Sequence, residues 1–564
     1  MKKIHLLLLA AIVLIAACNT KNQKKENEME KQFVSFAEKH QKQIEPLYKQ
    51  LTEAYFKASI TGNSEDFQKA AELELEFVKI YTNKDEFEQL KKYKESGEIK
   101  DSLMLQELNT LYNSYLANQA DPKMLQEMIN LATGIEEKYN KFRAVVNGKQ
   151  KSDNEIEEIL STSTNSKEVE IAWTEVKKLG PVVSEDIIAL VKMRNQLAQS
   201  LGFKNYHEMS LKLSDQDPEE ISKIFNELDE LTRDAFTELK SEIDIYLAKK
   251  FNIKPEDLKP WHYQNRFFQE APKMYEVDLD KYYTDQNIEK LTIDYYSSIG
   301  LDITDMIAKS DLYEKPGKNQ HAYCTSIDKN GDVRVLCNIK PNYNWMNTML
   351  HEFGHAVYDK YIDRELPFVL RDAAHTFTTE AIAMLFGRMA SNATWMKDMN
   401  IIDEAEKNAI SETGFRSLRL EQLVFSRWAQ VMYNFEKSMY ENPDQDLNKL
   451  WWDMVEKYQM LNRPEGRDMP DWATKTHIAS SPCYYHNYLL GELLASQLNY
   501  YICTQILKTD DFNHQSFAGN EEVGKFLTEK VFMPGARYHW NEMIEKATGE
   551  KLTAKYYAMQ FIDK

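Results

Sequence analysis

The sequence has little glycine, proline or positive charge, and each shortage excludes a class of protein. Only 18 glycines and 15 prolines occur among 564 residues, so the many turns of a β-sandwich or β-barrel lack the residues that form them. Lysine and arginine (70) are outnumbered by aspartate and glutamate (89), and the net charge is −19. Because a phosphate backbone is bound by clustered cations, we expect no nucleic acid partner. The composition favours a large, mainly helical protein.

Long hydrophobic runs are also scarce, and the one apolar run lies at the N-terminus. Met1-Lys2-Lys3 is followed by apolar residues from Ile4 to Ile15 and then by Ala16-Ala17-Cys18. The run is short for a membrane span and has the pattern of an export signal. Ile-Ala-Ala-Cys resembles the lipobox of bacterial lipoproteins, in which the cysteine becomes the lipidated first residue. We predict a signal peptide over residues 1–17, lipidation at Cys18 and a flexible tether over residues 18–30. An ordinary secretory signal is the alternative.

The rest of the chain is predicted to form one domain, residues 31–564, held at the bacterial cell envelope on either its periplasmic or its surface-facing side. It would touch the membrane only through the lipid anchor, and we expect a monomer. From about residue 31 to 150 apolar residues recur at helical spacing, which indicates a helical scaffold or a lid over a cleft. Asp217-Pro218-Glu219-Glu220 predicts the start of a long helix ending near Lys249. The aromatic and amide-rich segment from Pro260 to Phe268 either lines a ligand groove or packs between helices.

The strongest β signal surrounds Asn330-Gly331. The runs His321–Asp328 and Asp332–Ile339 are strand-like, and Asn-Gly favours a two-residue hairpin turn. Pairing across such a turn would place Cys324 opposite Cys337, since each lies six residues from it. In an exported protein this favours a disulfide, and two reduced, packed thiols are the alternative.

The sequence His351-Glu352-Phe353-Gly354-His355 predicts a metal site. On a helix, residues four apart share a face, so both imidazoles can bind one ion. Glu352 beside them can reach a water at the metal and act as its base. Gly354 weakens a helix by about 1 kcal/mol relative to alanine, which suggests that another backbone or the substrate approaches closely there.

A zinc site of this kind needs a third protein ligand and an open coordination position. Glu380 is the best candidate among the acids that follow, because it is a lone carboxylate in an apolar helical run, Thr378 to Phe386. A buried carboxylate without a partner is costly, and a metal removes that cost. A glutamate that stabilises a helix start is the alternative.

The order of motifs resembles the angiotensin-converting enzyme family of zinc peptidyl-dipeptidases, peptidase family M2. The family's H-E-M-G-H, D-L-P and H-E-A-I correspond to His351–His355, Glu365-Leu366-Pro367 and Glu380-Ala381-Ile382. Upstream, Tyr295–Leu301 is similar to F-F-T-S-L-G-L, and Glu314-Lys315-Pro316 with His321-Ala322 is similar to E-K-P and C-H-A-S-A. Downstream, Lys457-Tyr458-Gln459 and Lys475–Ser481 are similar to Y-Q and K-F-H-I-P-S-S. The resemblance extends from about residue 260 to 500, which we take as the catalytic core.

The resemblance implies a role for each matched residue. His351, His355 and Glu380 would bind one Zn²⁺, and Glu352 would be the general base. His477 and Tyr488 would stabilise the oxyanion, while Lys475 and Tyr485 or Tyr484 would hold the substrate's C-terminal carboxylate. The spacing leaves the roles of the three tyrosines open. His321 and Ala322 would contact the substrate backbone.

Three positions depart from the family pattern. The arginine that binds an activating chloride is replaced around His486-Asn487, so we expect no chloride activation. Met384 stands where the family has an acid one turn after the zinc-binding glutamate, and this changes the surroundings of the metal. The family's second carboxylate-binding amide has no assignable counterpart between residues 270 and 290.

We therefore predict a mainly α, two-lobed ellipsoid with a deep central channel, a gluzincin-type zinc helix on its floor and a small β-hairpin beside the site. The predicted reaction is the release of C-terminal dipeptides from oligopeptides. An endopeptidase of the related M3 type and a surface lipoprotein that binds peptides without cleaving them are the alternatives. A structural zinc protein fits less well, because three ligands leave one position open.

Overall fold

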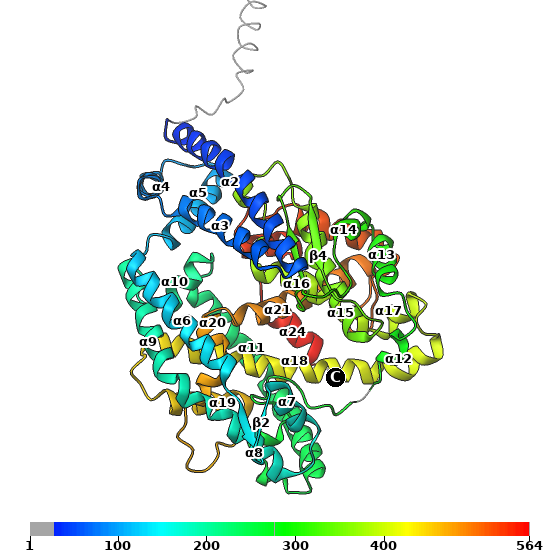
Figure 1. Cartoon of the computed structure of the whole chain (residues 1–564). Helices are drawn as coiled ribbons and strands as arrows, with labels where there is room; N and C mark the ends of the chain where they lie inside the picture. The colour runs from blue at the N-terminus through cyan, green and yellow to red at the C-terminus, as the bar shows by residue number, and fades with distance from the viewer. Residues whose placement is uncertain (1–27, 276, 563–564) are drawn as a thin grey trace, which may run out of the picture.

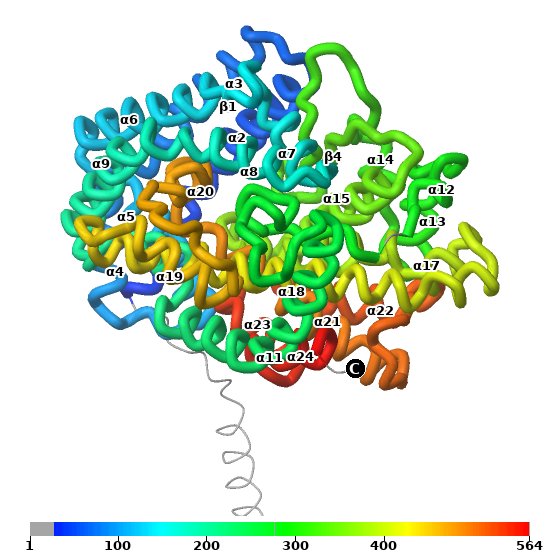
Figure 2. Tube along the Cα trace, turned by 90° about the horizontal axis from the view of Figure 1, so that it is seen from below, coloured from blue at the N-terminus to red at the C-terminus, as the bar shows by residue number. Residues whose placement is uncertain are grey.

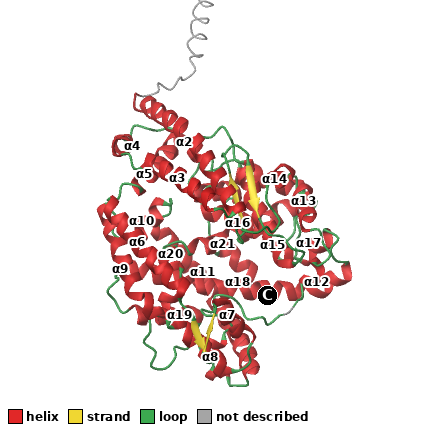
Figure 3. Cartoon of the chain, viewed as in Figure 1, coloured by secondary structure: helices red, strands yellow, loops and turns green. Residues whose placement is uncertain are grey.

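The computed structural model describes residues 28–275 and 277–562. The signal peptide, the lipidation site Cys18 and most of the tether lie outside the described residues. The described chain is mainly helical with two small antiparallel hairpins (Figure 3), which confirms the predicted fold class. None of its described helices is long and apolar enough to cross a membrane.

The N-terminal helices form one end of the molecule (Figure 1). They are α2 (Glu28–Thr61), α3 (Ser64–Tyr81), α4 (Lys84–Ser96) and α5 (Ser102–Ala117). Helix α2 reaches across to the second hairpin, where the Tyr48 hydroxyl donates to the carbonyl of Ser326 (3.2 Å) and Thr52 Oγ1 donates to that of Ile327 (2.6 Å). Helix α2 is thus docked directly on the hairpin beside the predicted site.

The next segment contains a hairpin that the sequence analysis missed. It comprises α6 (Pro122–Lys141), β1 (Ala144–Val146), β2 (Lys149–Lys151), α7 (Asp153–Thr162), α8 (Ser166–Lys177), α9 (Leu179–Ser200), α10 (Tyr206–Leu213) and α11 (Pro218–Phe251). The turn between β1 and β2 is Asn147-Gly148, with φ of 53° and 76°, the left-handed pair that Asn-Gly adopts readily. Asp217 caps α11 by accepting from the backbone N–H groups of Glu219 and Glu220, as predicted.

The second hairpin, β3 (Tyr323–Ser326) with β4 (Val333–Leu336), has a different register from the predicted one. Asp328 accepts hydrogen bonds from the backbone N–H groups of Asn330 and Asp332. This side chain closes a four-residue loop in place of a two-residue turn. Cys324 therefore pairs with Val335, and Cys324 and Cys337 are separate thiols. The predicted disulfide is wrong because the Asx turn shifts the register by two residues.

Around this hairpin lie α12 (Asp280–Tyr283), α13 (Ile288–Ser298), α14 (Thr304–Lys309), α15 (Tyr343–Tyr361), α16 (Thr376–Gly387) and α17 (Ala393–Asp398). The chain then continues through α18 (Glu404–Glu441), α19 (Leu447–Gln459), α20 (His477–Ser480), α21 (His486–Tyr501), α22 (Glu521–Leu527), α23 (Trp540–Thr548) and α24 (Lys555–Phe561). Figures 1 and 2 both place α6 and α9 on one side, α12 to α14 and α17 on the other, and α18 between them. One large apolar core runs through both sides.

The closest backbone contact near the predicted site is between α15 and α16 at Gly354. A Cβ at Gly354 would lie 2.8 Å from the Cα of Ala383 and 3.2 Å from the carbonyl oxygen of Ile382. Both neighbours are backbone atoms, which cannot turn aside as a flexible side chain could. The sequence predicted that Gly354 allows a close approach, and the approaching backbone is that of α16.

Gly354→Ala should therefore destabilise the protein by about 1–3 kcal/mol through overpacking. The measurement is the free energy of unfolding by denaturant. Gly134→Ala is the matched control, because Gly134 lies in α6 with no atom within 4 Å of an added Cβ. That variant should be neutral or more stable by about 0.5–1 kcal/mol. Equal stability of Gly354→Ala and wild type would contradict the packing argument.

Candidate metal centre and active site

The predicted metal ligands converge from α15 and α16. Asn342 begins α15 by accepting from the backbone N–H of Trp345, and the four-residue spacing puts His351 and His355 on one face of this helix. Their Nε2 atoms lie 3.7 and 3.8 Å from Oε2 of Glu380. One ligand atom from each of the three residues lies within 4.8 Å of the others, which is a spacing that one ion can bridge.

Burial prepares these groups for a cation. It lowers the pKa of His351 to about 4 and, together with His351, that of His355 to about 3, so both imidazoles are neutral and free to bind a metal. Burial and nearby Glu492 raise the pKa of Glu380 to about 7. Burial and Glu380 raise the pKa of Glu352 to about 8. The donor set of two neutral nitrogens and a carboxylate fits a zinc ion, whose charge would favour both carboxylates as anions.

Thr379 orients one of the ligands. Its Oγ1 lies 2.8 Å from Nδ1 of His355. With Nε2 as the metal-binding atom, Nδ1 would carry the proton and donate a hydrogen bond to this hydroxyl. Met384, which replaces the family's acid, cannot accept such a bond strongly, so the hydroxyl supplies the outer contact from a different position on α16.

Glu352 lies between the metal ligands and the edge of β3. Its side chain accepts from the backbone N–H of Cys324, and the residue is only 8% exposed. His321 and Ala322 directly precede β3 (Tyr323–Ser326), and β3 pairs with β4 alone among the described strands. The predicted substrate-contacting residues therefore lie directly before the strand that borders the predicted base.

Lys475 lies in a buried aromatic box. Its Nζ is 5.5, 5.3 and 5.3 Å from the ring centroids of Phe267, Trp428 and Tyr485, and it donates to Oε1 of Gln269 at 2.6 Å. Burial and the charge of Arg266 lower the pKa of Lys475 to about 8. The side chain is thus a poorly hydrated cation held ready for an anion. Phe267 of the aromatic segment from Pro260 to Phe268 packs against Lys475, and Gln269 directly follows this segment.

The three tyrosines divide into two groups. Tyr485 belongs with Lys475, and its hydroxyl accepts from Nε1 of Trp428 at 2.8 Å. Tyr484 and Tyr488, one helical turn apart, contact each other with ring centroids 5.4 Å apart, and the charge of Glu380 contributes to the raised pKa of both. Tyr484 and Tyr488 therefore lie near the metal ligands, whereas Tyr485 lies at the lysine.

His477 packs against Tyr485, which in turn packs against Tyr488. Its ring centroid is 5.1 Å from that of Tyr485, and Tyr485 is in turn 5.4 Å from Tyr488. Burial and the charge of Lys475 lower the pKa of His477 to about 4. The imidazole is neutral, and one of its nitrogens can donate a hydrogen bond.

The segment that carries these residues is held from the far side of the molecule. Arg194 of α9 donates to the carbonyl of Ala479 (2.6 Å) and to the Tyr440 hydroxyl (3.2 Å). Glu436 of α18 accepts from the backbone N–H of Cys483 (3.0 Å), whose φ of 55° is unusual for a residue with a side chain. These buried bonds fix the turn between His477 and the tyrosines.

The position where the family has a chloride-binding arginine is occupied by a buried hydrogen-bonded chain. Nε2 of His486 lies 2.7 Å from Oε1 of Gln216, and Nε2 of Gln216 donates to Oδ1 of Asn487 at 2.8 Å. Burial lowers the pKa of His486 well below its usual value. The three side chains are therefore neutral.

Comparison with protein families agrees with this geometry. The model of peptidase family M2, described as angiotensin-converting enzyme, matches residues 26–561. The chain belongs to this family.

Curated relatives include members named angiotensin-converting enzyme from animals. The protein of Mesocricetus auratus is 22% identical over 295 residues, half of this chain and 22% of its own length. That of Haematobia irritans exigua is 22% identical over 451 residues, 72% of each chain. Carboxypeptidase 1 of Bacillus subtilis is 26% identical over 259 residues, 42% of this chain and half of its own length. The first relatives are thus matched over half their length or less.

Two residues of this M2 peptidase site were not predicted from the sequence. Gln269 is the amide at Lys475; it lies just before residues 270–290 and directly after the aromatic segment from Pro260 to Phe268. Thr379 precedes Glu380 where the family has a histidine, and that substitution was the available signal. Spacing alone could not indicate that its hydroxyl meets His355 on another helix.

Thr379→Val should weaken zinc binding about 10–100-fold, because it removes the acceptor that orients His355. Zinc affinity can be measured by competition with a chelator. Thr376→Val, at an exposed position in the first turn of the same helix, should bind zinc as wild type does. An unchanged affinity of Thr379→Val would show that His355 is positioned without this contact.

Proposed function

We propose that this M2 family member is a zinc-dependent peptidyl-dipeptidase that releases C-terminal dipeptides from oligopeptides. The observation that carries the proposal is the pair of centres described above. A metal-ligand triad with a buried carboxylate beside it lies at one end, and a buried cation with an amide and a tyrosine lies at the other. The first can hydrolyse a peptide bond, and the second can hold a terminal carboxylate at a set distance from it.

Each residue then has a chemical task. Zinc held by His351, His355 and Glu380 would polarise the scissile carbonyl and acidify a water. Glu352 takes the proton from water and delivers it to the leaving amine. Tyr488 and neutral His477 donate hydrogen bonds to the oxygen that becomes negative.

Further residues hold the substrate. Lys475, Gln269 and Tyr485 bind its terminal carboxylate, while Tyr484 lines the path between the two centres. His321 and Ala322, which directly precede β3, contact the substrate's extended backbone.

We also propose where the protein works. Cys18 with the preceding apolar run supports a lipid-anchored protein of the bacterial cell envelope, with oligopeptides as its substrates. Helices α2 to α5, of which α2 is docked on the second hairpin, would act as a lid that keeps folded proteins out.

The decisive experiment is digestion of an oligopeptide with product masses measured. Zinc-loaded wild type should release dipeptides successively from the C-terminus, and the same peptide with an amidated C-terminus should resist. Glu352→Gln should lower kcat by about 10²–10⁴-fold, as expected on loss of a general base, while metal analysis shows zinc still bound. Internal fragments from the amidated peptide would favour an M3-type endopeptidase. Binding without cleavage would favour a peptide-binding protein.

Lys475 predicts the alkaline limb of the pH profile. Its pKa of about 8 makes it a cation below that pH and neutral above it, so attraction of the substrate carboxylate is lost as pH rises. We expect kcat/KM to fall above about pH 8, because this ratio reports groups of the free enzyme. In Lys475→Arg the guanidinium stays charged, so this fall should disappear even if the overall rate is lower. Coincident alkaline limbs for the two proteins would refute the assignment.

A further inference from the structure

Gln216 connects the loop between α10 and α11 to the first turn of α21. The residue is 2% exposed, and its two side-chain ends have different partners. Its Oε1 lies 2.7 Å from Nε2 of His486, and its Nε2 donates to Oδ1 of Asn487 at 2.8 Å. Both partners are buried as well. Because no water replaces these contacts, loss of the glutamine would leave a buried donor and a buried acceptor unpaired.

The start of α21 has no side-chain cap of its own. The side chain of Tyr485, at the N-cap position, accepts no hydrogen bond from the helix backbone. By contrast, α11 is capped by Asp217 and α15 by Asn342. The start of a helix without a cap depends on other contacts to hold it in place. Here the two hydrogen bonds of Gln216 supply those contacts.

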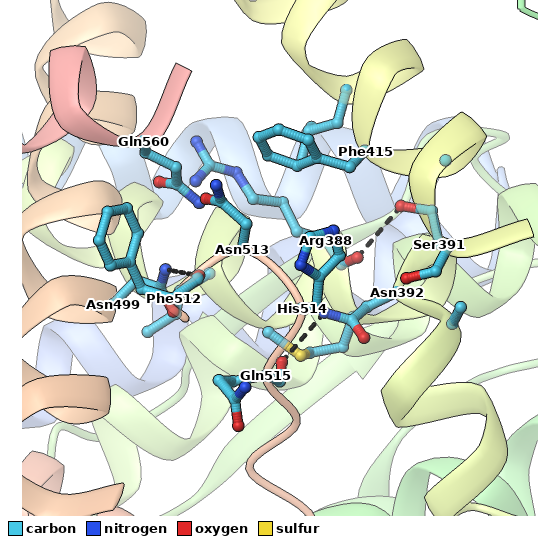
Figure 4. A pocket seen from close by; sticks show the side chains of 16 residues that line it. Arg388, Ser391, Asn392, Phe415, Asn499, Phe512, Asn513, His514, Gln515 and Gln560 are labelled. Atoms are coloured by element: carbon cyan, nitrogen blue, oxygen red, sulfur yellow. Dashed lines mark hydrogen bonds between the residues drawn. The ribbon is translucent and has the colours of Figure 1, made fainter. Parts of the chain in front are cut away.

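Tyr488 lies between this first-turn contact and a second contact further along α21. One helical turn after Tyr488, Glu492 forms an ion pair with Arg388, and both side chains are largely buried. The guanidinium of Arg388 lies beside Gln560 and Asn513 (Figure 4). The ion pair holds the middle of the helix, and the hydrogen bonds at the first turn hold its start. Together they fix where Tyr488 lies.

The loop that carries Gln216 is anchored on its other side. Asp215 has a φ of 61°, a conformation that is uncommon for residues with a side chain. Its carbonyl accepts from Nε2 of His539 at 2.9 Å and from Nε1 of Trp540 at 2.8 Å. These two bonds hold the backbone that presents Gln216 to α21.

The same loop contacts the start of α16, the helix that carries the metal ligand Glu380. His375 caps α16 by accepting from the backbone N–H of Phe377 at 3.2 Å. The ring of His375 also hydrogen-bonds to the backbone of Ser214. Residues 214–216 therefore contact the first turns of two helices, one with a metal ligand and the other with the tyrosine. Their relative position depends on this loop.

We propose that Gln216 is a positioning residue of the reaction, which holds the first turn of α21 so that the Tyr488 hydroxyl meets the oxygen that becomes negative. The inference rests on the proposed dipeptide release and adds a residue that acts through Tyr488. A misplacement of about 1 Å in such a group can cost about 10²-fold in rate. Since an oxyanion donor acts mainly in the transition state, the loss appears in kcat and leaves KM nearly unchanged.

A double-mutant cycle with Tyr488 tests this directly. Gln216→Met keeps the approximate volume of the side chain and removes both hydrogen bonds. We expect its kcat for dipeptide release to fall about 10–100-fold, with KM within about twofold of wild type. Tyr488→Phe alone should lower kcat by about 10²–10³-fold. In the Tyr488→Phe background, Gln216→Met should lower kcat by less than about twofold, because no hydroxyl remains to be positioned.

Gln497→Met is the matched control. Gln497 is a buried glutamine of the same helix, and its Nε2 donates to Oγ1 of Thr548 and to the carbonyl of Glu550. It lies nine residues after Tyr488, about 14 Å along the helix. This variant also breaks buried hydrogen bonds of α21, and its free energy of unfolding is measured beside that of Gln216→Met. Its kcat should stay within about twofold of wild type, with or without the Tyr488 hydroxyl.

Asn487→Ala removes only one of the two bonds and serves as the test variant if Gln216→Met does not fold. Its smaller loss of kcat should also disappear in the Tyr488→Phe background. The inference is overturned by an unchanged kcat, by an equal loss with and without the Tyr488 hydroxyl, or by the same loss in Gln497→Met. Each of these results leaves dipeptide release standing. If wild type releases no dipeptide, the proposed function fails and this inference fails with it.

Discussion

The packing of α15 against α16 is the contact on which the site depends. Two ligands come from one helix and the third from the other, and their atoms meet only because the backbones touch at Gly354 and Ala383. The same contact brings Thr379 to His355. A helix pair at the usual 8–10 Å separation with a larger residue at position 354 would move Glu380 away from both imidazoles. The glycine costs helix stability, and close packing offsets that cost.

A second constraint is the separation between the metal ligands and Lys475. The ligands belong to α15 and α16, whereas the segment from Lys475 to Tyr485 is held by Arg194 of α9 and Glu436 of α18. Helix α21 packs on α16 and on α18, and α18 holds the Lys475–Tyr485 segment through Glu436, so these two helices connect the two groups. A movement of one side relative to the other would change the distance between the metal ligands and Lys475. Several buried hydrogen bonds, which are costly to break, oppose that movement.

The sequence was sufficient to predict those features that depend on residues close together in the chain. The two histidines and Glu352 lie within one helical turn, and Asp217 and Pro218 mark a helix start by their own side chains. The motif order also indicated the family. The sequence was insufficient to predict contacts between segments that are far apart in the chain. Gln269 reaches Lys475 across 206 residues, and no periodicity encodes that contact. The hairpin register depended on Asp328, whose carboxylate outweighed the Asn-Gly signal, while the same dipeptide at Asn147 formed the expected turn without being predicted.

The electrostatics of the site explain why it can be both buried and reactive. Burial raises the pKa values of Glu352 and Glu380. A raised carboxylate pKa means that the ionised form is less favourable in the folded chain than in the unfolded one, so at neutral pH these groups cost stability. A dication at His351, His355 and Glu380 reverses this cost, because it favours the anionic forms. Metal binding and folding are therefore coupled through the same carboxylates.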